Sequence, residues 1–309
     1  MYYYELALLK SPLNNLTFQS EKKIILGKKV LIKLKQRKNL DEAVVIKEVE
    51  KPTFKCSDIV EITNEYFDEK MQQIASFVSQ YYVCSLGEAL SVYIPFDENI
   101  NPIFNEEKFD SKIVLSAQQE KAKEFLKDKK QALLFADTGA GKTEVYIKII
   151  EEHLNANKQA ILLMPEISLT PQMQKRLEKV FGKSIAIWHS KITKKKKEEI
   201  LKGLQEGSIR LIAGARSALF LPYSNLGVIV VDEEHDDSYK SDSKPRFHTK
   251  DLSIYMAKKF DLQLVLGSAT VSSSSFFKIP FFRLDETYHQ TKKYYSFEDS
   301  EAKLSLKVI

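Results

Sequence analysis

The sequence is poor in cysteine and has no long hydrophobic run, and each of these deficits excludes a class of protein. Cys56 and Cys84 are the only two cysteines among 309 residues, and their wide separation supports neither a zinc site nor a disulfide framework. No apolar run approaches the roughly 18 residues of a membrane span, and residues 1–5 lack the features of a secretory signal. We therefore expect a cytoplasmic protein with no membrane partner.

The excess of positive charge is also small. A formal net charge of +5 and an isoelectric point near 8.8 permit a polyanionic partner without requiring one. A hydrophobic content of 43% over 309 residues is enough for two ordinary domains, each with a buried core. Composition alone thus indicates a soluble globular protein and does not define its partner.

The pattern of apolar residues changes near residue 95, which predicts two units. Residues 1–95 read as short strands followed by a helix. Residues 29–35 alternate lysine with apolar residues, as in a half-buried strand with a basic outer face, and apolar residues recur at helical spacing from Asp68 onward. Residues 96–114 contain Asn-Pro and an acidic run and are predicted to be a linker. From 115 to 309 strands and helices alternate, as in a parallel sheet.

The individual elements can be placed from periodicity and turn residues. A second short helix of the first unit is expected at 86–94. In the second unit we expect strands at 131–135, 159–164, 185–188, 209–213, 227–231 and 262–266, and helices at 116–127, 143–154, 169–181, 193–205 and 250–260. Gly182 is predicted to cap the end of a helix. Beyond Val271 no pattern predicts an element.

One apolar run leads directly into a glycine-rich loop, Ala136-Asp137-Thr138-Gly139-Ala140-Gly141-Lys142-Thr143. A strand, such a loop and a helix are typical of phosphate binding, because backbone N–H groups wrap phosphates, a lysine reaches the outer phosphates and a hydroxyl holds magnesium. Ala136 stands where the strict pattern has glycine, but Gly139 and Gly141 remain where positive φ is most needed. The alternative is a plain tight turn, which Lys142 and Thr143 at the helix start argue against.

A second apolar run ends in Asp232-Glu233-Glu234-His235. In a parallel sheet this places Asp232 at the carboxyl edge beside the phosphate loop, where magnesium would sit. Glu233 is predicted to orient or deprotonate an attacking water, since phosphoryl transfer depends on positioning and charge neutralisation. The alternative is a solvated acidic strand end. His235 is predicted to be structural, through a hydrogen bond to a neighbouring turn.

Two further features have two interpretations each. Gln118 and Gln119 open the helix before the phosphate loop and either offer an amide to an adenine edge or lie on the surface. Residues 191–197 contain five lysines, which are either a solvated helix face or, less commonly, a nucleic-acid contact.

Several other segments follow in a defined order: Leu163–Gln172, Trp188–Ser190, Gly214–Phe220, Asp232–Lys240 and Gly267–Thr270. Together with the phosphate loop they resemble, from 115 to about 270, the first motor lobe of a superfamily-2 helicase. The combination is most similar to the PriA family, also called primosomal protein N′, which restarts stalled replication forks. This resemblance implies an α/β RecA-like P-loop NTPase lobe preceded by a small β-rich (α+β) DNA-binding domain.

The resemblance also implies roles for particular residues. It implies that Ala136 to Thr143 bind ATP, that Gln119 lies near the base, and that Thr143 and Asp232 hold Mg²⁺ through ATP. Lys142, Asp232 and Glu233 are then catalytic, and residues 232–235 form a DEAH-type box.

Further residues are implied to face DNA. The implied contacts to the single strand are Pro165, Glu166, Thr170, Arg216 and Ser217, and those of an aromatic-rich loop are Tyr239, Arg246 and Phe247. Ser268 and Thr270 are implied to relay the nucleotide state to the DNA track. Phe18 falls at the family's pocket for the 3′ end of DNA. The chain departs from the family at Gln19, Pro245 and Val271, where an acidic residue, a tryptophan and a proline are usual.

A superfamily-2 motor closes its ATP site with a second lobe, and neither this lobe nor the family's zinc module is recognisable here. We therefore expect a truncated portion of an ATP-dependent 3′-to-5′ DNA helicase, which binds ATP and branched or single-stranded DNA but turns over slowly. Zinc is expected only in the missing C-terminal part. The implied partners are single-stranded DNA-binding protein and the proteins that load the replicative helicase, at the nucleoid. The rival hypotheses are another superfamily-2 DNA translocase and a non-catalytic fork-binding module.

Overall fold

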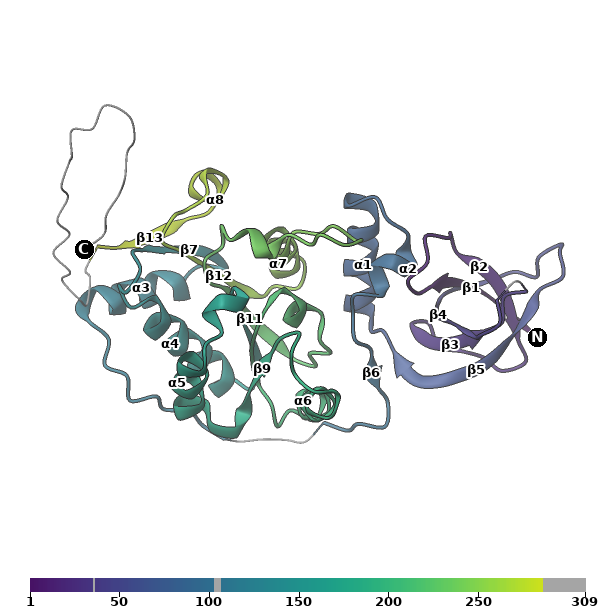
Figure 1. Cartoon of the computed structure of the whole chain (residues 1–309), viewed down its shortest axis with the longest axis horizontal. Helices are drawn as coiled ribbons and strands as arrows, with labels where there is room; N and C mark the ends of the chain where they lie inside the picture. The colour runs from purple at the N-terminus through teal and green to yellow at the C-terminus, as the bar shows by residue number, and fades with distance from the viewer. Residues whose placement is uncertain (36, 103–106, 286–309) are drawn as a thin grey trace, which may run out of the picture.

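The computed structural model describes residues 1–35, 37–102 and 107–285, and these residues form two sheets of different kinds (Figure 1). The first sheet and its two helices are β1 (Tyr2–Leu8), β2 (Leu16–Ser20), β3 (Lys28–Ile32), β4 (Asp41–Val49), β5 (Ser57–Tyr66), α1 (Glu69–Tyr81), α2 (Leu86–Leu90) and β6 (Phe96–Asp97). The strand order is β2-β1-β4-β3-β5-β6, and β2 also pairs with β5. This additional pairing closes the sheet into a small barrel, so that few strand edges are left open.

Alternating side chains fill the barrel. Tyr4, Leu6 and Leu8 of β1 and Val30 and Ile32 of β3 are all buried, as the period of two along a strand requires. The strand predicted from alternating lysines is confirmed as β3, and it pairs with β4 in antiparallel orientation.

The basic outer face predicted for β3 is partly neutralised by acidic neighbours. The strand is interior, because it pairs with β4 on one side and β5 on the other. Lys29 on its outer face is bridged by Glu42 at 2.7 Å and Glu65 at 2.6 Å, so this lysine is neutralised within the sheet.

Both helices of the first unit begin at capping residues. Asp68 accepts a hydrogen bond from the Met71 amide at the start of α1, and Ser85 forms a capping box with Glu88 at the start of α2. Helix α2 ends at Leu90, earlier than predicted, because the chain turns there to bury Tyr93. The following residues are not wholly a linker either, since Phe96–Asp97 add a short strand to β5.

The second sheet is parallel throughout and has the order β13-β7-β12-β11-β8-β10-β9. Its elements are α3 (Ala117–Lys127), β7 (Gln131–Ala136), α4 (Lys142–Asn155), β8 (Gln159–Leu163), α5 (Pro171–Phe181), β9 (Ile185–Trp188), α6 (Lys194–Glu206), β10 (Leu211–Gly214), β11 (Leu226–Val231), α7 (Thr249–Lys259), β12 (Gln263–Ser268), α8 (Ser273–Lys278) and β13 (Phe281–Leu284). The predicted elements of this unit are confirmed to within a few residues, including the helix end at Gly182, which has φ of 57°.

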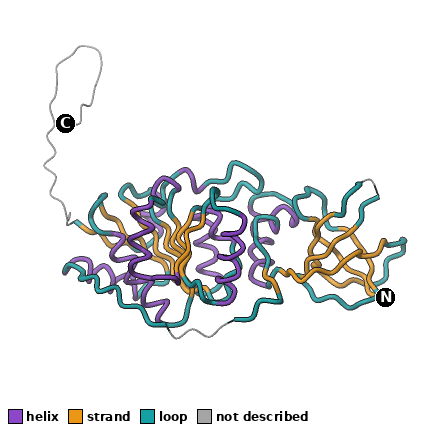
Figure 2. The backbone as a smooth tube through the Cα atoms, turned by 60° about the horizontal axis from the view of Figure 1, so that its bottom comes forward, coloured by secondary structure: helices purple, strands orange, loops and turns teal. Residues whose placement is uncertain are grey.

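Helices cover both faces of this sheet, which lies between two helical layers (Figure 2). Helices α3, α4 and α5 pack on one face, and α6 and α7 pack on the other. Successive residues of each central strand therefore alternate between two buried cores, which explains the nearly uninterrupted apolar runs of these strands.

The two units share a packed boundary. Helix α1 lies against α7, where the rings of Phe77 and Tyr255 stack with centroids 3.7 Å apart. The Ile94 amide donates to the Phe220 carbonyl at 3.0 Å, and apolar residues of α1 and α2 continue into the core beneath α6 and α7. The first unit is thus seated on the sheet that carries the phosphate loop.

Helix α8 and strand β13 are found where no pattern had predicted an element. Both are short, and α8 is built largely from serines, which carry no apolar periodicity. Strand β13 pairs with β7 and extends the parallel sheet. The C-terminal stretch 286–309 lies outside the described residues, as does part of the predicted linker. Among residues 1–35, 37–102 and 107–285, no helix is both long and apolar enough to cross a bilayer.

Candidate nucleotide-binding and DNA-binding sites

The glycine-rich loop has the backbone geometry expected of a phosphate-binding loop. Gly139 and Gly141 have φ of 84° and 86°, which confirms the predicted positive values. A Cβ on Gly141 would also lie 2.2 Å from Nε2 of Gln119, so both conformation and space require glycine there. The loop leads into α4 with Lys142 as its first residue, and no side chain caps this helix end, whose first N–H groups have no partners within the helix.

Lys142 lies between the loop and the carboxylates that follow β11. Its side chain is 9% exposed, and Nζ donates to the Ala136 carbonyl at 3.0 Å and lies 3.2 Å from Oε1 of Glu233. The prediction that residues 232–235 lie beside the phosphate loop is therefore confirmed. The ammonium group of Lys142 is thus held by two protein oxygens, one from the loop and one from the acidic box.

Asp232 is a buried carboxylate at the carboxyl end of β11. Burial first, and the nearby negative charge of Glu233 second, raise the pKa of Asp232 to about 6. Its Oδ1 accepts a hydrogen bond from the Tyr146 hydroxyl at 3.0 Å. A carboxylate in such a place fits a magnesium site, because a divalent cation would favour the ionised form, and Thr143 lines the same cavity with a second oxygen donor.

Tyr146 was not predicted as a site residue. It is 1% exposed on α4, and its hydroxyl would lie only 1.5 Å from a Cβ on Gly267. The glycine that opens Gly267–Thr270 is therefore required so that Tyr146 can reach Asp232. In the sequence, the only sign of this role is that Tyr146 lies about one helical turn after Thr143. A tyrosine that merely fills the core can occupy the same position, so the sign is weak.

Glu233 has an unusual backbone conformation, and both of its carboxylate oxygens have a polar partner. Its φ of 48° is in the left-handed region, which is uncommon for a residue other than glycine. One carboxylate oxygen faces Lys142, and the other accepts a hydrogen bond from the Ala269 amide at 3.2 Å. The carboxylate thus connects the phosphate loop with the turn after β12.

His235 is bound on both ring nitrogens, which confirms the predicted hydrogen bond to a neighbouring turn. Nδ1 lies 2.7 Å from Oγ of Ser268, and Nε2 lies 2.9 Å from Oγ1 of Thr270. Ser268 is wholly buried and Thr270 is exposed. These two hydrogen bonds connect the acidic box directly to the turn at residues 267–270.

Glu234 is wholly buried, and its partners were not predicted. Burial by itself would raise its pKa, but the ion pair with Lys250 at 2.6 Å and hydrogen bonds from Ser272 and Ser275 hold the pKa below the ordinary value. The serine-rich stretch 272–275, where no element was predicted, thus supplies donors to a buried carboxylate. This network fixes α8 and α7 to the acidic box.

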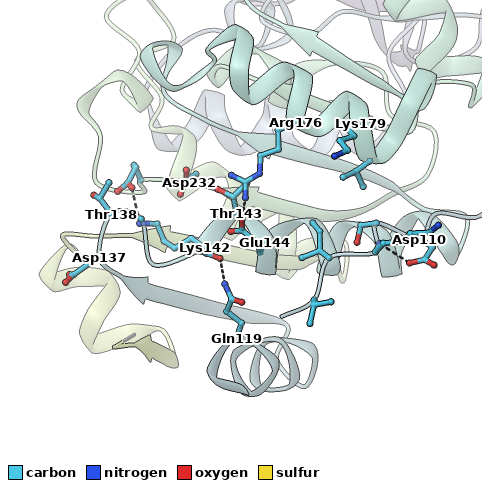
Figure 3. A pocket seen from close by; sticks show the side chains of 18 residues that line it. Asp110, Gln119, Asp137, Thr138, Lys142, Thr143, Glu144, Arg176, Lys179 and Asp232 are labelled. Carbon is cyan, nitrogen blue, oxygen red and sulfur yellow. Dashed lines mark hydrogen bonds and ion pairs between the residues drawn. The ribbon is translucent and has the colours of Figure 1, made fainter. Parts of the chain in front are cut away.

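The phosphate loop and the carboxylates of Asp232 and Glu233 line one cavity of about 1050 Å³ (Figure 3). Its wall is formed by the phosphate loop, Asp232, Glu233, Gln119, the segment 110–114, and residues of α5 that include Arg176 and Lys179. Gln119 is 6% exposed; its Nε2 donates to the Gly141 carbonyl at 3.2 Å and its Oε1 accepts from the Ser116 amide at 2.8 Å. Gln119 therefore supports the loop and is not a surface residue. Segment 110–114, predicted as linker, is part of the site.

Some of the residues predicted to face DNA are exposed, and others are buried. Glu166, Thr170, Ser217 and Arg246 are exposed, as such contacts need. Arg216 is partly exposed, and its Nη1 donates to the carbonyls of Ser238, at 2.9 Å, and Lys240.

Four residues predicted to contact DNA have buried side chains in this structure. Tyr239 is wholly buried and donates to the Asp232 carbonyl at 2.6 Å, and Phe247 packs edge-on against Phe220. Phe18 fills the barrel core, and Pro165 is buried beside the end of β8. At these four positions the side chain is packed in the protein interior. None of them can stack on a base without leaving the core.

A parallel sheet whose phosphate loop faces an acidic box defines one lobe of a P-loop helicase. The DEAD/DEAH box helicase family model matches residues 116–278, and the chain belongs to this family. A second model, described as a 3′DNA-binding domain (3′BD) of PriA, matches residues 10–95.

The curated relatives give the finer placement. The chain is 40% identical over 320 residues to the replication restart protein PriA of Helicobacter pylori strain J99, an alignment that covers 100% of this chain and 50% of that protein. It is 45% identical over 144 residues to PriA of Bacillus subtilis, covering 47% of this chain and 18% of that protein. The chain therefore matches the N-terminal half of PriA and spans about half the length of the Helicobacter relative.

Solved helicase structures are more distant. RecG bound to a three-way DNA junction aligns with a TM-score of 0.44 and 21% identity, over 59% of this chain and 25% of that chain. A DEAD box protein from Methanococcus jannaschii aligns with a TM-score of 0.39 and 18% identity, over 59% and 57% of the two chains. These values are too low to carry an argument about function.

Proposed function

We propose that the cavity binds MgATP and that the chain, through both units, binds branched and single-stranded DNA as part of a 3′-to-5′ helicase that restarts replication. The observation that carries the proposal is the convergence of Lys142, Asp232 and Glu233 at a loop whose two glycines adopt positive φ. A helicase domain uses nucleotide, and this is the place in the described residues with the chemistry to hold its phosphates.

Each group has a role in this proposal. Amides of residues 138–143 bind the phosphates, and Lys142 leaves the Ala136 carbonyl to join them. Thr143 and Asp232 hold magnesium, which when bound would neutralise phosphate charge. Glu233 orients the attacking water, because its carboxylate already stands beside Lys142 and the Ala269 amide.

The activity of a whole PriA-like protein is also a proposal for this chain. The described residues supply one motor lobe, and the arginine of a second lobe contributes a factor of about 10³ or more in other NTPases. We therefore expect residues 1–309 to bind nucleotide and forks with little turnover. A zinc module in a C-terminal part, recruitment of single-stranded DNA-binding protein and helicase loaders, and action at the cytoplasmic nucleoid belong to the same proposal.

Calorimetric titration of MgATP into Lys142→Ala tests the nucleotide site. We expect loss of measurable binding, while the matched variant Lys175→Ala, which removes an exposed lysine of α5 outside the cavity, binds as the parent does. Fork affinity is measured on the same samples. Absence of saturable MgATP uptake by the folded parent chain would overturn the proposal, and unchanged fork affinity in Lys142→Ala with MgATP present would favour a binding module that needs no ATP.

The DNA track is tested through the salt dependence of fork binding. If Arg216 contacts a phosphate, Arg216→Ala should lower the slope of log affinity against log salt by about one. Lys258→Ala, which removes an exposed lysine of α7, is the control and should leave the slope unchanged. An unchanged slope in Arg216→Ala removes this residue from the track.

A further inference from the structure

Two buried tyrosine hydroxyls meet at Asp232, and neither has a role in the function proposed above. Tyr146 donates from α4 to Oδ1 of the carboxylate at 3.0 Å, and Tyr239 donates from the loop after β11 to the main-chain carbonyl at 2.6 Å. Tyr146 is 1% exposed and Tyr239 is wholly buried. Hydroxyl groups enclosed in this way do not reach a ligand, so they act on the nucleotide site only through Asp232.

Tyr146 holds the side chain of Asp232 from the helix that begins at the phosphate loop. Thr143 and Tyr146 are three residues apart on α4, so they lie on one face of this helix. Thr143 and Asp232 both line the cavity and are the two proposed magnesium ligands (Figure 3). A single rigid element therefore carries one ligand and the group that orients the other. Because a carboxylate has about four acceptor positions, the hydrogen bond from Tyr146 leaves Asp232 able to bind a cation.

Tyr239 holds the main chain of Asp232 where the sheet no longer does. Strand β11 ends at Val231, and Glu233 has φ of 48°, so the chain turns sharply directly after Asp232. A carbonyl group in such a buried place needs a hydrogen-bond donor, and the Tyr239 hydroxyl supplies one. Tyr239 is fixed in turn, because Oγ1 of Thr249 donates to its carbonyl at 3.0 Å. Both the direction of the carboxylate and the position of its backbone are thus set by tyrosine hydroxyls.

A magnesium site gains from ligands that are held in place before the ion arrives. Magnesium tolerates little distortion of its oxygen ligands, and groups that orient a metal ligand commonly change metal affinity by about 10- to 100-fold. We propose that Tyr146 and Tyr239 are positioning residues of the magnesium site, Tyr146 for the carboxylate of Asp232 and Tyr239 for its main chain. This inference rests on the proposed ATP site. It gives Tyr239 a role inside the protein in place of the DNA contact that the resemblance implied.

The proposal is tested by measuring the affinity for MgATP and for ATP in EDTA; the ratio of the two is the contribution of magnesium. Competition with a fluorescent ATP analogue extends the measurement to weak binding. Tyr146→Phe removes one hydroxyl group and should weaken MgATP binding by about 10-fold, while binding of ATP in EDTA stays within about twofold of the parent. Equal losses with and without magnesium would show that the hydroxyl shapes the cavity in general, and would overturn the assignment.

Tyr239→Phe is the second variant, because it acts on the same ligand from another element. It should lower the contribution of magnesium by about 3-fold or more. Its affinity for single-stranded DNA without nucleotide should equal that of the parent, since the lost hydroxyl is buried. A loss of DNA affinity with an unchanged contribution of magnesium would return Tyr239 to the DNA track and contradict the positioning role.

Tyr223→Phe is the matched control. It also removes a buried tyrosine hydroxyl, which donates to the Ala218 carbonyl at 2.7 Å, and Tyr223 does not line the nucleotide cavity. This variant should bind both forms of ATP as the parent does. The fluorescence of Trp188, the single tryptophan, reports whether each variant is folded. If Tyr146→Phe does not fold, Tyr239→Phe alone decides, and a parental contribution of magnesium in that variant overturns the proposal.

Failure of this inference can be told from failure of the proposed site. No saturable MgATP binding by the folded parent refutes the ATP site itself. Magnesium-dependent binding by the parent, its loss in Lys142→Ala and a parental contribution of magnesium in both tyrosine variants refute only the positioning role.

Discussion

Replacing Asp232 by asparagine should make the nucleotide-free protein more stable and at the same time remove its magnesium-dependent ligand binding. Burial and the charge of Glu233 raise the pKa of Asp232 from 3.8 to about 6. The ionised carboxylate is therefore disfavoured in the folded state. Asparagine keeps an oxygen that can accept the hydrogen bond from Tyr146 and carries no charge.

The magnitude follows from the difference in pKa between the unfolded and folded states. Below pH 3.8 Asp232 is protonated in both states and costs nothing; between 3.8 and 6 the cost grows as pH rises, and above 6 it is complete. A difference of about 2 pH units corresponds to about 3 kcal/mol. We expect Asp232→Asn to raise the free energy of unfolding by up to about 3 kcal/mol at pH 7.5 and by only about 1 kcal/mol at pH 4.5.

Urea unfolding followed by Trp188 fluorescence measures this difference, because Trp188 is buried in the same sheet as Asp232. Asp242→Asn, which alters an exposed carboxylate, is the control and should change stability little at either pH. MgATP should stabilise the parent protein and not Asp232→Asn. A destabilised Asp232→Asn at pH 7.5, or a gain that is as large at pH 4.5, would refute the argument from burial.

Three further substitutions test contacts that hold the site. Gly267→Ala should destabilise the protein by about 1–3 kcal/mol in urea unfolding, because the new Cβ would lie 1.5 Å from the Tyr146 hydroxyl, and adding Tyr146→Phe should recover part of the loss. Lys250→Met should cost about 3–5 kcal/mol by leaving Glu234 buried without its ion pair; the double variant with Glu234→Gln should lose less than the sum of the two single changes, and additive losses would contradict the pair. The Tyr82 hydroxyl accepts a hydrogen bond from the His248 amide at 3.1 Å. Tyr82→Phe removes this acceptor and should lower the free energy of unfolding by about 1 kcal/mol. An unchanged unfolding midpoint would show that this bond does not hold the loop before α7.

Much of the second unit was predictable because its signals are local. A strand, a glycine-rich loop and Lys142-Thr143 occupy consecutive positions, and the positive φ at Gly139 and Gly141 follows from the same motif. The position of Asp232 was predictable as well, since all strands of a parallel sheet end at one edge.

Contacts between distant segments were not predictable. Tyr146 is one of several buried residues on α4. Only the structure shows that its hydroxyl passes Gly267 of β12 and donates a hydrogen bond to Asp232. The partners of Glu234 come from α7 and from a serine-rich stretch without periodicity. The family resemblance implied that Tyr239 contacts DNA, yet the core beneath its loop encloses it.

The sequence by itself was sufficient to predict a lobe with a phosphate-binding loop, because phosphate binding needs a few residue types at fixed spacing along a continuous segment of chain. Only the tertiary structure decided which side chains are buried, which carboxylate has a raised pKa and which serines bind the buried Glu234. Those properties depend on the distance of each group from solvent and from charges that lie far away in the chain, and one-dimensional spacing does not record either distance.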